Sequence, residues 1–370
     1  MNEKNDGSFS VEHIISVANM YFKTDARITD EDYLKTYNIF KLGDIAFEGN
    51  KSKDFAFGRF VENTIGDGIV SHVFVVFRPV NLSHNLGYWK YAINNENVMG
   101  RILARCTKKT TMMTNLVTSD FLEQTICCPS PDEQAHIATF LSLIDIRIKK
   151  QEQLIETLKK YKRGFISGML NQKFAITHEE ENWEEVSLSD VAEGFEYGIN
   201  AAATNFDGVH KYIRITDIDD DSHTYLDGDP VSPSGVFEDK YRVKENDILF
   251  ARTGASVGKS YLYQETDGDL FFAGFLIRIH VKDGVDSGYV FLNTLTEEYN
   301  KWVLLESARS GQPGINAEQY KRYRFKLPSL KTQKRLSVIM RKMDERLNKE
   351  SIYLRFLQNQ KHGLLQQLFI

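Results

Sequence analysis

Two similar stretches divide the sequence: ICCPSPDEQAHIATFLSLIDIRI begins at Ile126, and FKLPSLKTQKRLSVIMRKMDERL begins at Phe325. They align without a gap at an offset of 199 residues, and the matches extend beyond them, as between Gly164 and Gly363. A chain that repeats itself at such a distance is built from equivalent structural units. The repeat therefore predicts two related halves, each ending in the same kind of segment.

Apolar residues in both stretches recur at alternating intervals of four and three, which is the a/d seam of a coiled coil. The second copy has this seam at Leu336, Met340, Met343, Leu347, Glu350, Leu354, Leu357, Lys361, Leu364 and Leu368. The equivalent positions of the first copy are Ile137, Leu141, Ile144, Ile148, Gln151, Ile155, Leu158, Lys162, Phe165 and Met169. Each copy predicts a helix of about 40 residues, roughly 60 Å long at 1.5 Å per residue.

One long helix with an apolar stripe would leave that stripe in water, whereas two with matching stripes can bury them against each other. Equivalent units related by a pseudo-two-fold axis place the two helices antiparallel. The alternative is that each helix packs on its own domain or joins a partner's bundle. We expect pairing within the chain, through Leu141, Ile144, Ile148, Ile155, Leu158, Met340, Met343, Leu347, Leu354 and Leu357.

The composition fits a folded protein of more than one domain, with 370 residues, 42% hydrophobic and 26% charged. No apolar run approaches the roughly 18 residues that span a bilayer, and the N-terminus MNEKNDGSFS has no apolar signal core. Cys106, Cys127 and Cys128 form no CxxC pair. These features predict a cytoplasmic protein without a membrane contact or a metal site.

Each long helix follows a segment with α/β character. In the second segment, from Trp183 to Leu327, short strand-like runs alternate with Gly/Asp/Ser turns, and one helix is expected over Tyr289 to Leu305. The strand-like runs are Lys211 to Ile215, Asp247 to Arg252, Lys259 to Tyr263 and Phe271 to Val281. The first segment carries weaker echoes in the same order, such as GDIAFEG from Gly43 against NDILFAR from Asn246.

Taken together, these features resemble the DNA sequence-specificity (S) subunit of Type I restriction–modification systems. The resemblance rests on WEEVSLSDVAEG from Trp183, ILFARTGASVGKS from Ile248, SGQPGIN from Ser310, KLPSLKTQKRL from Lys326 and HGLLQQLF from His362. It covers the chain from about Gly43 onward, and the order of the motifs, together with the paired long helices, makes it specific.

The resemblance implies an α+β fold in which two α/β target-recognition domains are separated by two long antiparallel helices forming a coiled coil. The expected segments are a first recognition domain at 1–128, a helix at 129–173, a linker at 174–182, a second recognition domain at 183–327 and a second helix at 328–370. The first domain is shortened: 43 residues precede Asp44, whereas 64 lie between Trp183 and the equivalent Asp247, counting Trp183. Either it is a divergent type or its start has been lost, which puts recognition of the first half-site in question.

The same resemblance implies a non-catalytic subunit that binds a bipartite site in double-stranded DNA and docks two methyltransferase (M) subunits on its helices. A restriction (R) motor-nuclease subunit is a further expected partner. S-adenosylmethionine, ATP and Mg are expected only on these partners, so the chain itself is expected to hold no cofactor. No Asn-Pro-Pro-Tyr or Asp-Pro-Pro-Tyr methyltransferase stretch occurs in the sequence.

A glycine-rich stretch, GASVGKS from Gly254 to Ser260, imitates a phosphate-binding P-loop but is one residue short and precedes a strand-like run. We interpret it as a turn that brings Arg252, Thr253, Ser256 and Lys259 close to DNA, with a purely structural hairpin as the alternative. Side chains able to read bases follow in two loops. These candidates are Arg309, Ser310, Gln312 and Asn316 in the second half, and Lys108, Lys109, Thr111 and Asn115 in the first.

The charge distribution opposes DNA binding by the second segment. Residues 174–325 carry 14 Lys and Arg against 28 Asp and Glu, and the Asp217, Asp219, Asp220 and Asp221 cluster is expected as an exposed loop pointing away from DNA. The acidic balance favours a rival hypothesis, a coiled-coil scaffold whose domains bind proteins and read no DNA.

Overall fold

The computed structural model describes residues 3–24, 31–52, 55–80, 85–109, 113–170, 181–308 and 313–369. The chain forms two compact units. Unit 1 comprises residues 1–152 and 352–370, and unit 2 comprises residues 153–351. Each unit therefore includes part of both long helices, and its globular part packs against these helix segments. The expected linker at 174–182 lies outside the described residues except for its last two.

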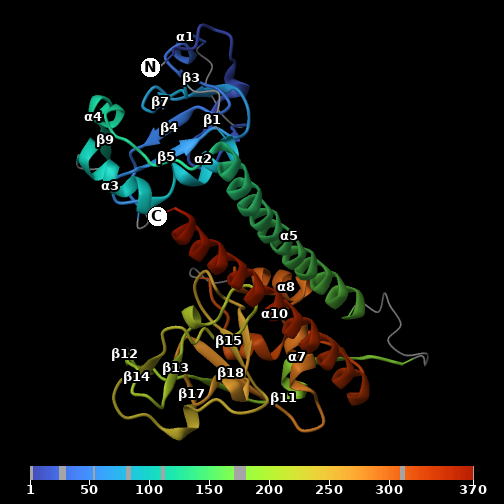
Figure 1. Ribbon diagram of the computed structural model, residues 1–370. Helices are drawn as coiled ribbons and strands as arrows, with labels where there is room; N and C mark the ends of the chain where they lie inside the picture. The colour runs from blue at the N-terminus through green and yellow to red at the C-terminus, as the bar shows by residue number, and fades with distance from the viewer. Residues whose placement is uncertain are drawn as a thin grey trace. The chain divides into compact units, whose positions relative to one another are not determined.

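Two long helices, α5 (Pro131–Leu170) and α10 (Leu330–Leu368), are the longest elements of the chain (Figure 1). Proline at the first position of α5 suits a helix start, where its missing N–H costs no hydrogen bond. Both helices fall inside the ranges expected from the seam. The ten seam residues expected to pair are all buried or half-buried, with Leu141, Ile155, Met340 and Leu357 the most buried.

The helices run antiparallel in each unit. In unit 1, Leu141 of α5 shares an apolar cluster with Leu365 of α10 and with Phe369, which follows this helix, while Asp145, further along α5, meets Lys361, earlier in α10. In unit 2 as well, residues later in α5 contact residues earlier in α10.

The unit 2 contacts follow the repeat. Lys162 of α5 forms an ion pair with Asp344 of α10, and Ile166 and Met169 share a cluster with Met340 and Leu336. The antiparallel helix pair expected from the sequence is confirmed.

The centre of unit 2 is a four-stranded antiparallel sheet in the order β11-β18-β15-β16. Its strands are β11 (Ala192–Tyr197), β18 (Leu276–Val281), β15 (Asp247–Ala251) and β16 (Ser260–Leu262). All five residues of β15 are buried. A strand buried on both faces reads as a continuous apolar run, as ILFA after Asp247 does.

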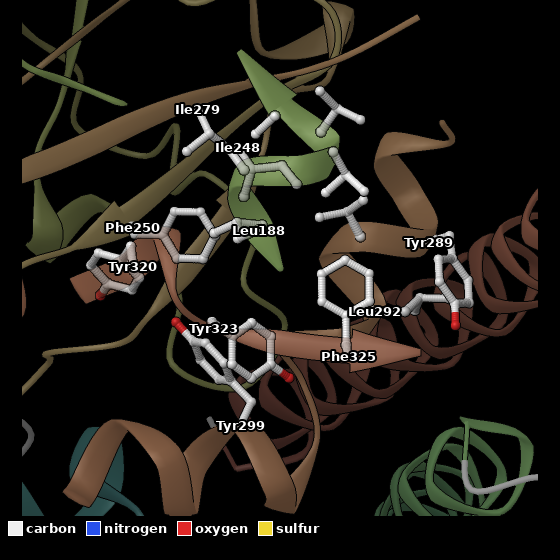
Figure 2. Packing of buried hydrophobic residues seen from close by; sticks show 14 of the residues in the cluster. Leu188, Ile248, Phe250, Ile279, Tyr289, Leu292, Tyr299, Tyr320, Tyr323 and Phe325 are labelled. Atoms are coloured by element: carbon white, nitrogen blue, oxygen red, sulfur yellow. The ribbon is translucent and has the colours of Figure 1, made fainter. Parts of the chain in front are cut away.

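Side chains of β15 alternate between two cores. Ile248 and Phe250 point to one face of the sheet, which is covered by α7 (Ser287–Asn293), α8 (Glu297–Ser307), α9 (Ala317–Lys321) and β19 (Arg324–Leu327), as Figure 2 shows. Tyrosines dominate that cover, and their hydroxyls bond to main-chain oxygens, as Tyr299 does to Gly258 (2.9 Å) and Tyr320 to Ala251 (2.8 Å). Leu249 and Ala251 face the second core.

Smaller strand pairs complete unit 2. The strand β13 (Lys211–Ile213) pairs in parallel with β17 (Leu270–Phe272). Two antiparallel pairs, β10 with β19 and β12 with β14, involve β10 (Glu184–Ser187), β12 (Ala203–Asn205) and β14 (Val231–Pro233). The short α6 (Leu188–Val191) follows β10.

Two predicted elements of unit 2 are interrupted. The run Phe271–Val281 divides into β17 and β18, because Gly274 turns there and donates its backbone N–H to the Ile199 carbonyl (2.7 Å). The single helix expected over Tyr289–Leu305 is two helices, α7 and α8. The Thr296 side chain accepts from the Tyr299 N–H (3.0 Å) and so begins a new helix, an N-cap that the apolar pattern alone did not reveal.

Unit 1 contains a three-stranded antiparallel sheet in the order β5-β4-β7. Its strands are β5 (Arg59–Glu62), β4 (Ile45–Glu48) and β7 (Val75–Phe77). The pairs β1–β2, β3–β6 and β8–β9 flank it. They are formed by β1 (Ile15–Ser16), β2 (Tyr21–Phe22), β3 (Asn38–Phe40), β6 (Gly68–Val70), β8 (Thr107–Lys109) and β9 (Thr114–Leu116). The helices before α5 are α1 (Glu31–Leu34), α2 (Leu86–Ala92), α3 (Glu96–Cys106) and α4 (Thr118–Leu122).

The two units repeat one order of elements. In unit 1 it is β4, β5, β7, α2, α3, α4 and α5, and in unit 2 it is β15, β16, β18, α7, α8, α9 and α10. The block β10–α6–β11 has no counterpart among the described residues of unit 1, whose sheet has three strands instead of four. This is the place where the sequence indicated a shortened first half. Among the described residues, no helix combines the length and apolar character needed to cross a membrane.

Candidate nucleic-acid interface

One end of the unit 2 sheet gathers several of the candidate residues. The strands β11 and β15 end there and β18 begins there. The backbone of Thr253 pairs with that of Gly314, and the Ile315 N–H donates to the Arg252 carbonyl (2.9 Å). These bonds bring together two stretches that lie about 60 residues apart in the sequence. We call residues 197, 252–258, 275 and 313–316 the unit 2 rim.

Glycines shape this loop. Gly254 and Gly258 have φ of +76° and +87°, a region that favours glycine. A Cβ on Gly258 would lie 2.6 Å from the Val303 side chain, so this position also needs the missing side chain for close packing. The loop leads directly into β16, a strand, and so lacks the helix N-terminus that a P-loop requires.

Arg252 lies over the ring of Tyr197, with its guanidinium carbon 4.9 Å from the ring centroid. Its backbone is fixed on both sides, because its N–H donates to Phe275 (3.1 Å) and its carbonyl accepts from Ile315. Thr253 and Ser256 are half-buried in the same loop. The unit 2 rim thus presents a positioned arginine among small polar groups.

Lys259 differs from the other predicted contacts because its ammonium group is already engaged. It donates to the Ile218 carbonyl (3.0 Å) and forms an ion pair with Asp220, and its side chain is only 11% exposed. Asn316 also has a local role: its side chain caps α9 by accepting from the Gln319 N–H (2.9 Å). Arg309, Ser310 and Gln312 lie outside the described residues.

The acidic cluster is paired rather than free. Asp217 bonds to Arg214 (2.7 Å), Asp220 to Lys259, and Asp221 to Lys159 of α5 (2.8 Å). Asp219 turns the loop by accepting from backbone N–H groups within it, and these bonds lower its pKa. The loop therefore forms ion pairs with two lysines, Lys159 and Lys259. The sequence predicted only an exposed loop and did not indicate these pairs.

Unit 1 repeats the backbone junction of the unit 2 rim. The Thr114 N–H donates to the Gly49 carbonyl (2.8 Å), and Asn50 pairs with Met113. Thr114 is buried, and its hydroxyl donates to the carbonyls of Gly49 and Phe57 (both 3.0 Å). Gly49 therefore occupies in unit 1 the position that Arg252 occupies in unit 2.

The hairpin β8–β9 adjoins this junction and carries the predicted unit 1 contacts. Lys108 and Asn115 are exposed cross-strand partners, and paired residues of a sheet share one face. The Lys109 ammonium lies 5.6 Å from the Phe57 ring centroid. Thr111 lies outside the described residues. We call the residues 49–50, 108–109 and 113–115 the unit 1 rim.

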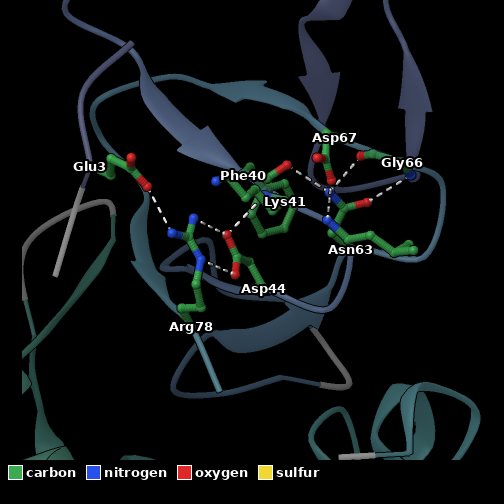
Figure 3. A network of polar contacts seen from close by, with 9 residues as sticks. Glu3, Phe40, Lys41, Asp44, Asn63, Gly66, Asp67 and Arg78 are labelled. Carbon is green, nitrogen blue, oxygen red and sulfur yellow. Dashed lines mark hydrogen bonds and ion pairs between the residues drawn. The ribbon is translucent and has the colours of Figure 1, made fainter. Parts of the chain in front are cut away.

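A buried aspartate begins the central strand region in both units. In unit 1, the Asp44 carboxylate accepts from the Lys41 N–H (2.8 Å) and pairs with Arg78, which also bonds to Glu3 (Figure 3). In unit 2, Asp247 accepts from the Lys244 N–H (2.8 Å) and bonds to Nδ1 of His280 (2.7 Å).

These partners offset the cost of placing a carboxylate in the interior, although burial still raises the pKa of Asp247. The shared arrangement is structural and fixes the start of the strand that ends at each rim.

The sequence did not point to two exposed aromatic side chains at the unit 2 rim, Tyr197 and Phe275, which are 41% and 59% exposed. Their only signal was the adjacent glycine in YG and GF. Aromatic side chains of this kind can stack on bases or on an arginine that contacts them.

Comparison with known proteins shows what this chain is similar to. Residues 180–353, which cover most of unit 2, match the model of the Type I restriction modification DNA specificity domain. This stretch, just under half of the chain, is similar to the specificity domain of Type I restriction–modification systems. No curated protein gives a significant match to the sequence.

Two solved structures resemble this chain over its whole length. One is a chain from a study of complex assembly and conformational transition of the type I R-M system, with TM-score 0.61, 14% identity, and coverage of 100% of this chain and 94% of that one. The other is the Type I restriction–modification S subunit from M. genitalium, with TM-score 0.57, 17% identity, and coverage of 100% and 92%. The fold is that of S subunits, as the sequence indicated.

Proposed function

We propose that this chain is the DNA sequence-specificity subunit of a Type I restriction–modification complex, and that its two rims read the two halves of a bipartite DNA site. The observation that carries the proposal is the repeated junction. The bond from Thr114 to Gly49 in unit 1 and the bond from Ile315 to Arg252 in unit 2 join equivalent segments at equivalent sheet ends. Polar side chains that suit base or phosphate contacts accompany both.

The acidic balance of the second half does not extend to its rim. The stretches RTGASVG at 252–258 and PGIN at 313–316 contain no Asp or Glu, whereas residues 174–325 as a whole contain 28. Because DNA repels carboxylates and attracts cations, a surface that approaches the phosphates should be depleted in acidic side chains. The unit 2 rim meets that requirement.

The long helices are proposed to dock two M subunits. In unit 1, α5 exposes Phe140, Leu143 and Ile146, and α10 exposes Ile352 and Phe356. The spacing of three residues places the α5 group on a face away from the seam. Apolar groups of this size on a charged helix favour a protein partner over water. Replacing Phe140 and Leu143 together by Asp should weaken co-purification with M, whereas Lys149→Asp and Lys150→Asp should weaken it less.

The chain itself is proposed to be non-catalytic, with S-adenosylmethionine, ATP and Mg bound by the partner subunits and cleavage by an R subunit. The purified chain alone should transfer no labelled methyl group to target DNA, and addition of M should start the transfer. Methyl transfer by the chain alone would contradict this part of the proposal.

Salt dependence separates this function from that of a protein-binding scaffold. The reconstituted complex of this chain with M should bind DNA containing its target with an affinity that falls steeply between 50 and 200 mM salt, by the about 10³-fold or more expected for several phosphate contacts. The matched control is M without the chain on the same DNA. Salt-insensitive binding to proteins, with no chain-dependent DNA binding, would support the scaffold instead.

A further inference from the structure

Arg252 differs from the other arginines of the unit 2 globular part. Between residues 181 and 327 the structure describes six arginines, and five of them form an ion pair with a carboxylate. These five are Arg214, Arg242, Arg278, Arg322 and Arg324. In so acidic a segment, an arginine without a carboxylate partner is the exception that needs an explanation.

The Arg252 guanidinium is also unsatisfied within the described part of the chain. Its Nε is buried and donates to no acceptor there. A charged donor left unpaired away from water costs more than the roughly 1–3 kcal/mol of a neutral group, and such a group in a native structure calls for an explanation, such as a water, an ion or a functional role. The stacking on Tyr197 and the backbone bonds to Phe275 and Ile315 hold the group in place despite this cost.

We infer that Arg252 is a specificity-determining residue that donates two hydrogen bonds to a guanine in one half of the DNA site. This inference rests on the proposed function. A planar, positioned guanidinium with free donors matches O6 and N7 of guanine, which accept two parallel bonds in the major groove. A lysine-like phosphate contact needs no such fixed plane, and lysines of this unit, such as Lys259, are instead paired with carboxylates.

The inference assigns the guanine to the half-site read by unit 2 alone. The equivalent position in unit 1 is Gly49, where even a Cβ would lie 2.2 Å from the Thr114 carbonyl oxygen. No arginine can occupy that position without moving the backbone, so the two units cannot read the same base in the same way.

The test measures methylation by the complex of the full chain with M. The DNA is a library that carries every single-base change in the target. For the wild-type complex we expect a split motif with a G·C pair that is required in one half-site. Arg252→Ala should reduce discrimination at that pair by about 10- to 100-fold, the range for loss of one bidentate contact, and leave the other half-site unchanged. Arg252→Met keeps an apolar stem beside Tyr197 and should show the same loss of discrimination. It replaces the alanine variant in the test if that variant folds poorly.

Arg324→Ala is the matched control, because it removes the same charge from a strand outside the rim and should leave the motif unchanged. A uniform loss of methylation over all sequences in the Arg252 variants, as for a phosphate contact, would overturn the inference, as would an unchanged motif or a half-site without a required G·C pair. A wild-type complex that shows no chain-dependent motif would instead refute the proposed function itself.

Discussion

Glu62 of β5 is a carboxyl group in an interior position, with only 3% of its surface exposed. Burial raises its pKa to about 8, although Lys90 acts in the opposite direction. The equivalent residue of unit 2 is Leu262, which packs against the apolar core. The site is thus built for an apolar or neutral group, and the structure accommodates the protonated form of Glu62.

Glu62 should make the stability of unit 1 depend on pH. The folded protein keeps the proton up to about pH 8, whereas the unfolded chain releases it near 4.5. This stabilisation is complete below pH 4.5 and is lost as the pH rises through 8, with an amplitude on the order of a few kcal/mol. Urea unfolding at pH 5, 7 and 9 should show a free energy of unfolding that falls with pH in the wild type and falls less in Glu62→Gln. Parallel profiles for the wild type, Glu62→Gln and the exposed control Glu123→Gln would contradict this assignment.

Local sequence patterns pointed to some residues of the candidate interface and missed others. The GASVG stretch predicted a turn. The similar stretches that follow one another in the same order in both halves placed Asn115 and Asn316 in comparable loops. The position of Arg252 beside Ile315 depends on backbone pairing between distant stretches, and the capture of Lys259 by Asp220 depends on loop packing. Tertiary contacts of this kind leave no periodic signal in one sequence.

At the scale of elements, the long helices were predictable because their seams combine a seven-residue period with a repeat that aligns without a gap. One of the two polar seam positions of each copy, Lys162 in the first and Lys361 in the second, gains a meaning only in the structure. Lys361 pairs with Asp145 in unit 1 (2.6 Å), and Lys162 pairs with Asp344 in unit 2. Each pair is the repeat equivalent of the other, so the same bond fixes the antiparallel register twice.

The ion pairs should therefore stabilise the correct register of α5 and α10. In unit 2, Lys162→Asp would place two carboxylates together and should lower the free energy of unfolding by about 1–3 kcal/mol, while the swap Lys162→Asp with Asp344→Lys should recover most of the loss. In unit 1, Asp145 also accepts from the Tyr91 hydroxyl (2.5 Å).

The same swap in unit 1, Asp145→Lys with Lys361→Asp, should recover less, because Tyr91 then loses its acceptor and Lys90 faces a like charge. Chemical unfolding of the single and double variants measures both effects. Equal stability of the single and swapped variants would show that the pairs do not determine the register.

The other elements were predictable to different degrees. The buried strand β15 and the turn-bounded strands β13 and β16 lie where apolar runs predicted them. The α7–α8 break needed the Thr296 cap. Most of unit 1 gave only weak sequence similarity to unit 2, since its described strands are two to four residues long. Short strands carry too few residues for a period of two to stand out.

At the scale of the whole molecule, the internal repeat has both a conserved and a divergent part. The helices, the sheet order and the rim junctions recur, whereas the block β10–α6–β11 and the arginine of the rim belong to unit 2 alone. Recognition of two different half-sites requires both parts. The shared elements can hold the two rims in place, while the rim residues differ between the units.

Methylome sequencing of cells that express the M subunits with or without this chain tests the central claim most directly. The account predicts a methylated motif that appears only with the chain and consists of two defined half-sites separated by unspecified bases. A single half-site would mean that unit 1 reads no sequence. Methylation that does not depend on the chain, or one uninterrupted motif, would contradict the claim that this molecule carries two DNA readers.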